Sequence, residues 1–426
     1  MIDYARALHL LLDNLVRLPA ETCPLALAPG RVLAGAIHSP IALPSFDHAA
    51  MDGYALAARE PLPAGSEHAV RGSQAAGDAA RESAGGAWEI MTGARLPDGL
   101  DTVVPVERTE RLATRADGTP ARIRLLDPLA TGQNVRRAGS DVAPGTGVLP
   151  AGTVVDAAQV MMLAALGVAE VEVVRRPRVA IICTGKELQA DPSQPLAPGR
   201  IYASNGPYLV AELAAAGAQV LSCDTVDDAA DTFAEALQRA LDAGAELVIS
   251  TGAVSMGRHD FVPDSLRRLD AQILFHKVAM RPGRPLLCAR LAAGPLILAL
   301  PGTPMAVAVG LRFFVVPALR AMAGQPAEPM WHAVLDAAQH PRPGLRCFLH
   351  ATLRQGPDGR LLASVQGLQQ PFRIQPFAAA DAWVVLGEDA GDCPAGTRVE
   401  IVGLRPGLPP RIQPAPPADQ AEGVRA

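Results

Sequence analysis

The fold of this chain is decided by one stretch, Leu247-Val248-Ile249-Ser250-Thr251-Gly252-Ala253-Val254-Ser255-Met256-Gly257-Arg258-His259-Asp260. Its first three residues form a short apolar run that predicts a buried strand. The strand leads into a loop with two glycines, several hydroxyl side chains and a final carboxylate. Gly252 and Gly257 allow backbone N–H groups to turn toward a ligand. Such a loop at the carboxyl end of a strand suits an anion such as phosphate, with Asp260 placed to hold an accompanying Mg²⁺. The alternative, an ordinary polar turn between a strand and a helix, stays open on this segment alone.

The region around this stretch alternates apolar strands with helical segments. A helix expected from Pro207 to Ala216 has Asn205 as its N-cap and ends at Gly217. We expect strands at Val179–Cys183, Val220–Cys223, Leu247–Ile249 and Leu296–Leu300. The alternation predicts a parallel α/β sheet with helices on both faces. Ligands of such sheets bind beyond the carboxyl ends of the strands, where three polar or glycine-bearing loops are expected together, Thr184–Glu187, Thr251–Asp260 and Pro301–Pro304.

The rest of the chain has a different pattern of apolar residues, glycines and prolines. Its 426 residues suggest about three domains. Short alternating apolar runs between glycines and prolines predict a β-rich domain over residues 47–140. We assign the flanking residues 1–46 and 141–176 to one discontinuous domain, an N-terminal helix with an extended linker. The remaining assignments are 177–325 for the α/β domain, 326–404 for a C-terminal β domain, and 405–426 for a proline-rich disordered tail.

Composition narrows the class of protein. Hydrophobic residues make up 49% of the chain, enough for several cores, and a net charge of −5 gives no global attraction for nucleic acid or an acidic membrane. The six cysteines are scattered without metal-ligand spacing, which argues against a zinc site and favours a reducing cytoplasm. The amphipathic N-terminus lacks the apolar core of a signal peptide. The apolar run Met305–Leu319 is broken by Arg312 and Pro317, so we expect no membrane span.

Three further motifs combine carboxylates with glycines, namely Met51–Ala55, Met91–Glu107 and Asn134–Asp141. Taken singly, each carboxylate is typical of a solvated turn. Their order along the chain is more specific, because it continues with Thr184–Leu188, Thr251–Asp260, Val278–Pro285 and Leu300–Pro304. The whole series resembles the molybdopterin molybdenumtransferase family, which contains bacterial MoeA and the E domain of gephyrin. The resemblance covers nearly the whole chain to about residue 310 and continues more weakly to about residue 402.

The resemblance implies an elongated multidomain subunit with a MogA-like parallel α/β domain and a C-terminal domain like a β-barrel. It implies a Mg²⁺-dependent transferase that inserts molybdate into adenylylated molybdopterin and releases AMP. It also implies a homodimer whose site lies between the α/β domain of one subunit and the β-rich domain of its partner. A cytoplasmic location, a MogA-like adenylyltransferase and recipient molybdoenzymes complete the implied setting.

Matching the family motifs to this sequence gives three groups of implied site residues. The catalytic group is Asp52, Thr92, Asp141, Glu187 and Asp260. The metal group is Asp227 and Asp260. The cofactor-binding group is Gly252, Ser255, Gly257, Asp227, Arg281, Arg284, Pro301, Gly302 and Pro304. The chemistry needs a cation and N–H groups on the pyrophosphate, so that charge developing on the leaving AMP is stabilised.

The sequence departs from the family pattern at positions suited to a small oxyanion. Ala253 stands where glycine is usual, and its Cβ is costly if the position needs a positive φ. Arginines 281 and 284 replace lysines, Thr303 and Ala306 replace an asparagine and a serine, and His350 replaces an arginine.

Two readings therefore stay open. The first is an active insertase with a remodelled molybdate pocket, in which Arg281, Arg284 and a protonated His350 compensate for the lost donors. The second is a divergent paralogue that binds the pterin nucleotide as a carrier, chaperone or regulator. A third, an unrelated nucleotide-binding phosphotransferase, is disfavoured because the chain lacks a Gly-x-x-x-x-Gly-Lys-Ser/Thr loop.

Overall fold

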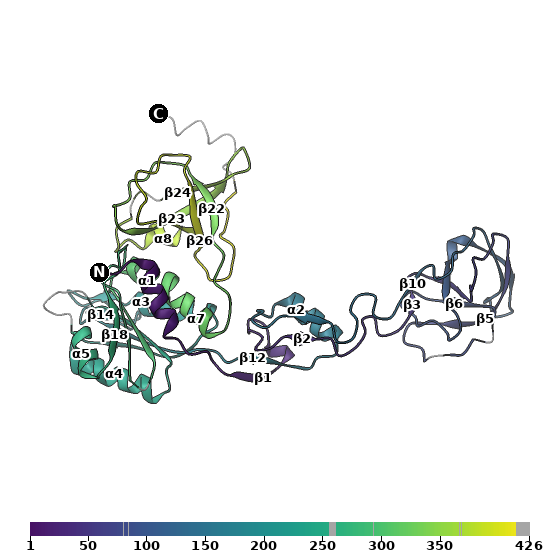
Figure 1. Cartoon of the computed structure of the whole chain (residues 1–426), viewed down its shortest axis with the longest axis horizontal. Coiled ribbons are helices and arrows are strands. Elements are labelled where there is room, and N and C mark those ends of the chain that lie inside the picture. The colour runs from purple at the N-terminus through teal and green to yellow at the C-terminus, as the bar shows by residue number, and fades with distance from the viewer. Residues whose placement is uncertain are drawn as a thin grey trace.

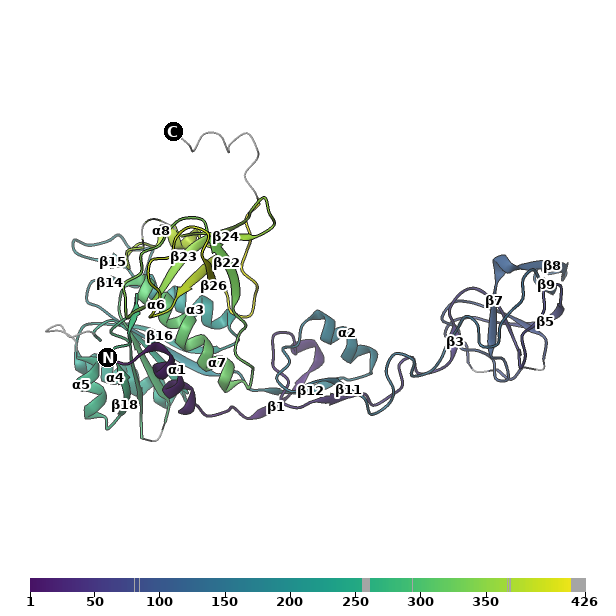
Figure 2. The ribbon, with the colours of Figure 1, turned by 45° about the horizontal axis from the view of Figure 1, so that its top comes forward.

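The computed structural model of the chain describes residues 1–79, 81–83, 85–254, 261–292, 294–365, 367 and 369–414. The molecule is elongated (Figures 1 and 2), as the sequence predicted. An α/β domain and a C-terminal barrel form a body at one end, a narrow arm leads away from it, and a β-rich domain lies at the far end of the arm.

The α/β domain is built on a six-stranded sheet with the order β16-β13-β17-β21-β20-β18. Strands β16, β13, β17 and β21 run parallel, which confirms the predicted parallel core. Strand β20 runs antiparallel to β21 and to β18. Only residues 291–295 join β20 to β21, and a connection that short permits only an antiparallel pair. The strands are β13 (Arg178–Thr184), β16 (Gln219–Val226), β17 (Leu247–Thr251), β18 (Gln272–His276), β20 (Leu287–Arg290) and β21 (Leu296–Leu300).

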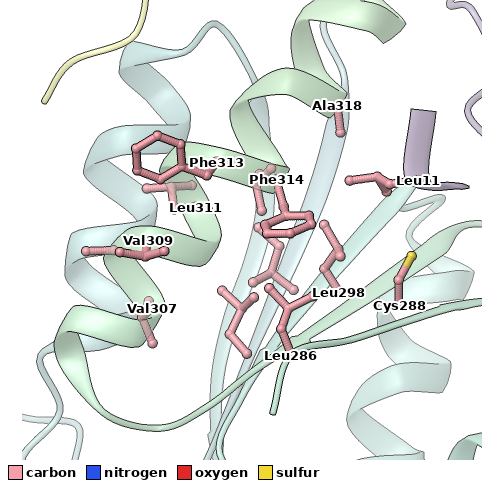
Figure 3. Packing of buried hydrophobic residues seen from close by; sticks show 14 of the residues in the cluster. Leu11, Leu286, Cys288, Leu298, Val307, Val309, Leu311, Phe313, Phe314 and Ala318 are labelled. Carbon is pink, nitrogen blue, oxygen red and sulfur yellow. The ribbon is translucent and has the colours of Figure 1, made fainter. Parts of the chain in front are cut away.

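Helices cover both faces of this sheet, as predicted. On one face, side chains of α4 (Ala230–Asp242) and α5 (Val262–Arg268) share a core with alternate strand residues such as Ile182 and Val248. The other face packs against α3 (Asn205–Ala215) and a helical run from Pro304 to Met322. Figure 3 shows Leu298 of β21 and Leu286 directed toward Phe314 and Val307 of that run. Each strand therefore alternates its side chains between two cores.

The run from Pro304 to Met322 consists of α6 (Pro304–Gly310), one π-helical turn (Leu311–Val315) and α7 (Val316–Met322). It is long and apolar enough to cross a membrane by composition, yet 83% of it is buried inside the fold, as in the core helix of a globular domain. Pro317 has no N–H to donate to the carbonyl of Phe313. The Tyr4 hydroxyl donates to that carbonyl instead, at 3.1 Å. Tyr4 thus satisfies the backbone group that the proline leaves open.

Tyr4 belongs to α1 (Tyr4–Asp13), which packs against α7 and β18. Its buried side chains Ala7 and Leu11 lie in the same core as Phe314 (Figure 3). The helix α1 therefore lies on the α/β domain. The sequence-based assignment had placed it with the linker, in residues 1–46.

The C-terminal domain is a closed barrel, as predicted. Successive pairings run β23-β24-β22-β26-β25 and return from β25 to β23. Its strands are β22 (Trp331–Leu335), β23 (Arg346–Gln355), β24 (Leu361–Val365), β25 (Ala382–Leu386) and β26 (Arg398–Gly403), with a short helix α8 (Gln375–Ala378). The α/β domain extends this barrel, because β19 (Met280–Arg281) pairs with β23.

The expectation of a disordered tail from residue 405 does not hold for residues 411–413. The buried carboxylate of Asp381 accepts hydrogen bonds from Arg411 Nε and Gln413 Nε2, both at 2.8 Å. The Gln413 N–H also donates to the Leu353 carbonyl of β23 at 2.8 Å. This part of the tail is therefore bound to the barrel.

The arm is a pair of antiparallel chain segments. Strand β1 (Ala20–Pro24) pairs with β12 (Glu170–Val174), and β2 (Ile37–His38) pairs with β11 (Gly147–Leu149). The arm also carries η1 (Leu25–Leu27) and α2 (Ala157–Ala165). Asp156 caps α2 in a capping box with Gln159, and Gly167 beyond its end has φ +73°, as is typical where a helix ends.

The far domain contains a six-stranded sheet in the order β7-β4-β6-β5-β9-β8. These are β4 (Gly53–Leu56), β5 (Glu67–Gln74), β6 (Ala87–Ile90), β7 (Thr102–Pro105), β8 (Thr109–Thr114) and β9 (Pro120–Leu125), with η2 (Val106–Arg108) between β7 and β8. At its junction with the arm, β3 (His48–Ala49) pairs with β10 (Val135–Arg136).

Candidate active site

Three of the loops predicted to carry chemistry meet at the carboxyl edge of the α/β sheet. They follow β13, β17 and β21, which are neighbours in the sheet. The contact between them is close: a Cβ added at Gly252 would lie 2.5 Å from Thr184 Oγ1, and a Cβ added at Gly302 would lie 3.4 Å from the Gly252 Cα. Thr184 Oγ1 also donates to the Thr251 carbonyl at 3.1 Å. Glycine is thus required at 252 because the backbones approach closely.

The sequence suggested that the N–H of Gly252 turns toward a ligand. In the structure this N–H instead donates to the Leu300 carbonyl at 3.0 Å. The open donors lie in the neighbouring loop. The N–H groups of Gly302 and Thr303 make no hydrogen bond to the described residues, and both residues are exposed. Pro304 then begins α6, so these N–H groups point out from the start of a helix. Both N–H groups are available to an anion at this edge.

Asn205 also belongs to this edge, although sequence reasoning gave it a different role. It was predicted to be the N-cap of α3, but the N-cap is Ser204, and Asn205 Nδ2 donates to the Gly302 carbonyl at 2.8 Å. The amide thereby fixes the loop that carries the open N–H groups. No local pattern distinguishes an N-cap from a side chain that bonds a distant loop.

Carboxylates of two further loops lie at the same edge. Glu187 is exposed, and its carboxylate folds over Gly185, where an added Cβ would lie 2.7 Å from Oε1. Asp227 follows β16 and is also exposed, and its carboxylate has no hydrogen-bond partner among the described residues. The adjacent Asp228, which sequence reasoning missed, accepts from the Lys186 N–H at 3.2 Å and so ties the two loops together.

Part of the opening motif cannot be placed in this way. Ser255, Gly257 and Asp260 lie outside the described residues. Ala253, just before them, has φ +48°, so the substitution for a usual glycine does introduce a Cβ into the left-handed region.

The two arginines that replace lysines flank a loop between the α/β domain and the barrel. Arg281 and Arg284 are both exposed, and Arg281 pairs in register with Cys347 of β23. A cavity of about 200 Å³ lies here, lined by Arg281 together with Arg342 and Gln369 of the barrel domain. Gly283 in the same loop faces Ala306 of α6, since an added Cβ would lie 3.8 Å from the Ala306 carbonyl oxygen. Several of the departures from the family pattern therefore lie close together.

His350 cannot provide the compensating positive charge suggested above. Its side chain is buried among Phe377 and Trp383, and Nε2 has no hydrogen-bond partner among the described residues. Burial lowers the pKa of His350 below the ordinary histidine value, so the imidazole is neutral near pH 7.

The far domain holds the other part of the predicted site. Asp52 Oδ1 accepts hydrogen bonds from both the Thr92 N–H, at 2.6 Å, and the Thr92 hydroxyl, at 2.7 Å. The backbone bond is the main cause of a lowered pKa for this fully exposed carboxyl group. Two predicted residues 40 positions apart are thus in direct contact, and Asp52 is ionised.

Asp141 lies at the junction of this domain with the arm. Its backbone N–H donates to the Leu43 carbonyl at 3.0 Å, and its carboxylate makes no hydrogen bond to the described residues. The ion pair at this junction is formed by Arg137 and Asp47, at 2.6 Å. Asp141 is therefore close in sequence to this ion pair but is not joined to the Asp52–Thr92 pair.

The two parts of the predicted site are not brought together within one chain. Asp52 and Thr92 adjoin β4 and β6 at the far end of the arm, whereas the β13, β17 and β21 loops belong to the body (Figures 1 and 2).

Comparison with known proteins assigns this architecture to a family. The chain is 33% identical over 417 residues to the molybdopterin molybdenumtransferase of Synechococcus elongatus, a match that covers 95% of this chain and all of the relative. The chain belongs to the molybdopterin molybdenumtransferase family. Molybdopterin molybdenumtransferase 2 of Mycobacterium tuberculosis is 36% identical to this chain. The match covers 90% of this chain and 95% of the relative.

Family domains and solved structures agree with this membership. The MoeA N-terminal region (domain I and II) matches residues 2–167, the probable molybdopterin binding domain matches 180–321, and the MoeA C-terminal region (domain IV) matches 332–404. Two crystal structures of a molybdopterin biosynthesis MoeA protein from Pyrococcus horikoshii superpose with TM-scores of 0.80 and 0.78, at 27% and 29% identity. They cover 95% and 94% of this chain and 99% of each solved chain.

Proposed function

We propose that this protein inserts molybdate into adenylylated molybdopterin and releases AMP, as a transferase of molybdenum cofactor synthesis. The observation that carries the proposal is similarity over the full length of relatives that are named molybdopterin molybdenumtransferase, with 33–36% identity. The open N–H donors and exposed carboxylates at the carboxyl edge of the sheet support it. These comparisons do not support the second hypothesis, a carrier or regulator without efficient insertion.

The carboxyl edge is the proposed site for the pyrophosphate link. The N–H groups of Gly302 and Thr303 would donate to phosphate oxygens at the start of α6. Asn205 holds that loop through the Gly302 carbonyl, so the donors are in place before the substrate binds. Pro301 and Pro304 restrict the backbone on either side of the same donors.

Mg²⁺ is proposed at the same edge, on Asp227 and Asp260. No group of three or more His, Cys, Asp or Glu side chains within the described ranges could hold a metal ion. Mg²⁺ is commonly bound by one or two carboxylates together with substrate phosphates and water, so two carboxylates would suffice. The Asp227 carboxylate has no hydrogen-bond partner among the described residues, so it is available for this purpose. When bound, Mg²⁺ would neutralise charge that develops on the phosphate oxygens as AMP leaves.

Molybdate is proposed to enter through the cavity lined by Arg281, Arg342 and Gln369. Guanidinium groups donate to tetrahedral oxyanions with defined geometry, so arginine retains the positive charge of the usual lysines with a different arrangement of donors. Arg284 lies in the same loop. Equilibrium dialysis with labelled molybdate tests the remodelled pocket, and ordinary saturable binding to an Arg281→Gln variant would remove Arg281 from this role.

The site is proposed to be composite, with Asp52 and Thr92 supplied by the partner in a homodimer. Their separation from the carboxyl edge within one chain supports this arrangement. Asp141 is proposed to act on the same side as Asp52, and Glu187 on the side of the α/β domain. A cytoplasmic location, supply of substrate by a MogA-like adenylyltransferase and delivery to recipient molybdoenzymes are proposed with it.

The insertase proposal is tested by incubating the protein with adenylylated molybdopterin, Mg²⁺ and molybdate. AMP release and reconstitution of an apo-molybdoenzyme are measured together. Metal-dependent reconstitution is the expected result, whereas binding of the pterin nucleotide without turnover would establish the carrier reading. Asp260→Ala is expected to abolish Mg²⁺-dependent AMP release. Asp264→Ala, which removes an exposed carboxylate paired with Arg267, is the matched control.

The composite site has its own test, in mixtures of two inactive variants. Asp52→Ala and Asp260→Ala chains are mixed and allowed to exchange subunits. A composite site predicts that half of the dimers regain one intact site of two, which gives about a quarter of wild-type activity. A mixture that stays inactive, although the subunits exchange, would contradict a site shared between subunits.

A further inference from the structure

The α/β domain has a second cavity at the opposite edge of its sheet. Its volume is about 530 Å³, within the range of small-molecule sites. It lies where β13, β17 and β21 begin, so the depth of the sheet separates it from the loops at the carboxyl edge. Residues 14–19, which lead from α1 into the arm, form one wall.

Three arginines from separate parts of the chain line this cavity: Arg17 from the loop after α1, Arg178 at the start of β13 and Arg290 at the end of β20. None of them lies within ion-pair distance of a carboxylate in the described part of the chain. Glu246 is the one acidic residue in the lining, and it pairs with Arg175 outside the cavity. Its other oxygen accepts from the Arg178 backbone N–H at 3.0 Å. The cavity therefore carries excess positive charge.

Arg178 is held in place without a partner for its charge. Its Nε is buried and makes no hydrogen bond to the residues that the structure describes. The guanidinium lies over Gly244, where an added Cβ would come within 3.0 Å of Nη1 and 3.2 Å of Cζ. Arg290 makes one long contact, 3.4 Å from Nη1 to Asn14 Oδ1. A guanidinium N–H that is removed from water and makes no hydrogen bond costs free energy, so a bound anion would stabilise these groups.

The remaining walls are mostly apolar, with Leu18, Leu241, Leu291 and Met322 among them. A fitting ligand therefore has an apolar or aromatic body as well as an anionic group. Several guanidinium groups around one cavity favour a dianion with several acceptor oxygens over a single carboxylate.

We propose that this cavity binds a small organic phosphate, with its phosphate on Arg178 and Arg290, Arg17 at the entrance, and its apolar part against the leucines. The site lies at the root of the arm. The Leu18 N–H donates to the Met322 carbonyl at 3.1 Å, and the Arg175 N–H donates to the Pro19 carbonyl at 2.9 Å. The first bond attaches one chain segment of the arm to the body beside the cavity, and the second joins the two segments of the arm to each other. The binding site does not depend on the proposed insertase activity.

Titration calorimetry on the full-length protein tests the site, with phenyl phosphate as the probe. Binding of phenyl phosphate is expected to be at least tenfold tighter than that of benzoate or inorganic phosphate. Arg178→Gln and Arg290→Gln are each expected to weaken it about tenfold or more, because each removes charged hydrogen bonds. Arg239→Gln is the matched control, since Arg239 is an exposed arginine of α4 that faces Asp224 at 3.7 Å. It is expected to leave the affinity unchanged.

Two further variants keep the test decisive. Arg178→Lys retains the charge and is expected to recover part of the affinity, and Arg17→Gln changes an exposed residue that the fold does not need. Affinity that is unchanged in Arg178→Gln and Arg290→Gln would overturn the proposal. Equal affinity for benzoate would overturn the assignment to phosphate. Both results can be obtained whether or not the protein inserts molybdate.

Discussion

Gly252 and Ala253 are adjacent residues with positive φ, +95° and +48°, for which we predict opposite effects of substitution. An alanine at 252 would place its Cβ 2.5 Å from Thr184 Oγ1 and 2.7 Å from the Thr184 carbonyl oxygen. The left-handed conformation costs a residue with a Cβ about 1–2 kcal/mol. Overlap with a backbone carbonyl adds about 1–3 kcal/mol of overpacking. Gly252→Ala is therefore expected to lower the free energy of unfolding by about 2–5 kcal/mol.

Ala253→Gly acts in the other direction. It removes the left-handed strain of about 1–2 kcal/mol but adds the backbone entropy of a glycine, about 0.5–1 kcal/mol. The expected result is a gain in stability of about 0–1.5 kcal/mol. The pair is informative because both substitutions change one methyl group in the same loop.

The assay must report on the α/β domain itself. The three tryptophans lie elsewhere, Trp88 in the far domain and Trp331 and Trp383 in the barrel. Their fluorescence would therefore miss the effect in a protein with several domains. Native-state hydrogen exchange of the amides in β13 and β17 measures the opening free energy of the right element. This account of the loop would be refuted if Gly252→Ala lowered the opening free energy by less than about 0.5 kcal/mol, or if Ala253→Gly were destabilising.

Sequence patterns predicted the architecture well because each pattern reports a local physical requirement. Apolar and β-branched runs located the four parallel strands of the α/β sheet but not the antiparallel strands β18 and β20, and Gly217 was found where α3 ends in the left-handed conformation. The family motifs implied Asp52 and Thr92 as site residues, but the contact between them came only from the structure. No local spacing would have paired them, since 40 residues separate them.

The incorrect predictions for individual residues share a physical cause, because each depends on a partner that lies far away in the sequence. The Gly252 N–H bonds the Leu300 carbonyl, and Asn205 bonds Gly302. Burial of His350 depends on aromatic residues contributed by other elements of the barrel domain. Sequence gives the chemical type of each group, but the partner depends on tertiary packing.

Three further predictions concern groups that hold the body together. Tyr4→Phe leaves the Phe313 carbonyl without its hydrogen bond and is expected to lower the opening free energy of α1 by about 1–3 kcal/mol, measured by hydrogen exchange. His350 has a lowered pKa, so below about pH 6.5 the unfolded chain takes up a proton that the folded chain does not, and stability falls on acidification. His350→Phe is therefore expected to lose less stability than wild type between about pH 7.5 and pH 5.5 in urea titrations, and an unchanged slope would contradict the neutral buried histidine. Arg312→Met leaves Glu328, its buried partner at 2.8 Å, without a counter-charge, and is expected to cost about 3–5 kcal/mol of unfolding free energy, most of which the double variant with Glu328→Met should recover.

The surroundings of Asp52 bear on the proposed composite site. Asp52 is charged and fully exposed, yet large apolar side chains beside it are exposed as well: Met51 by 38%, Met91 by 57% and Val106 by 37%. The Val106 N–H donates to the Asp52 carbonyl at 3.2 Å, so these residues share one small surface. In the proposed homodimer, the partner subunit would cover these exposed apolar side chains. Covering this surface would also remove water from Asp52, and the two hydrogen bonds from Thr92 would then keep the carboxylate ionised in the drier setting. In the proposed homodimer, the same residues would be both the contact and the chemical contribution of the far domain.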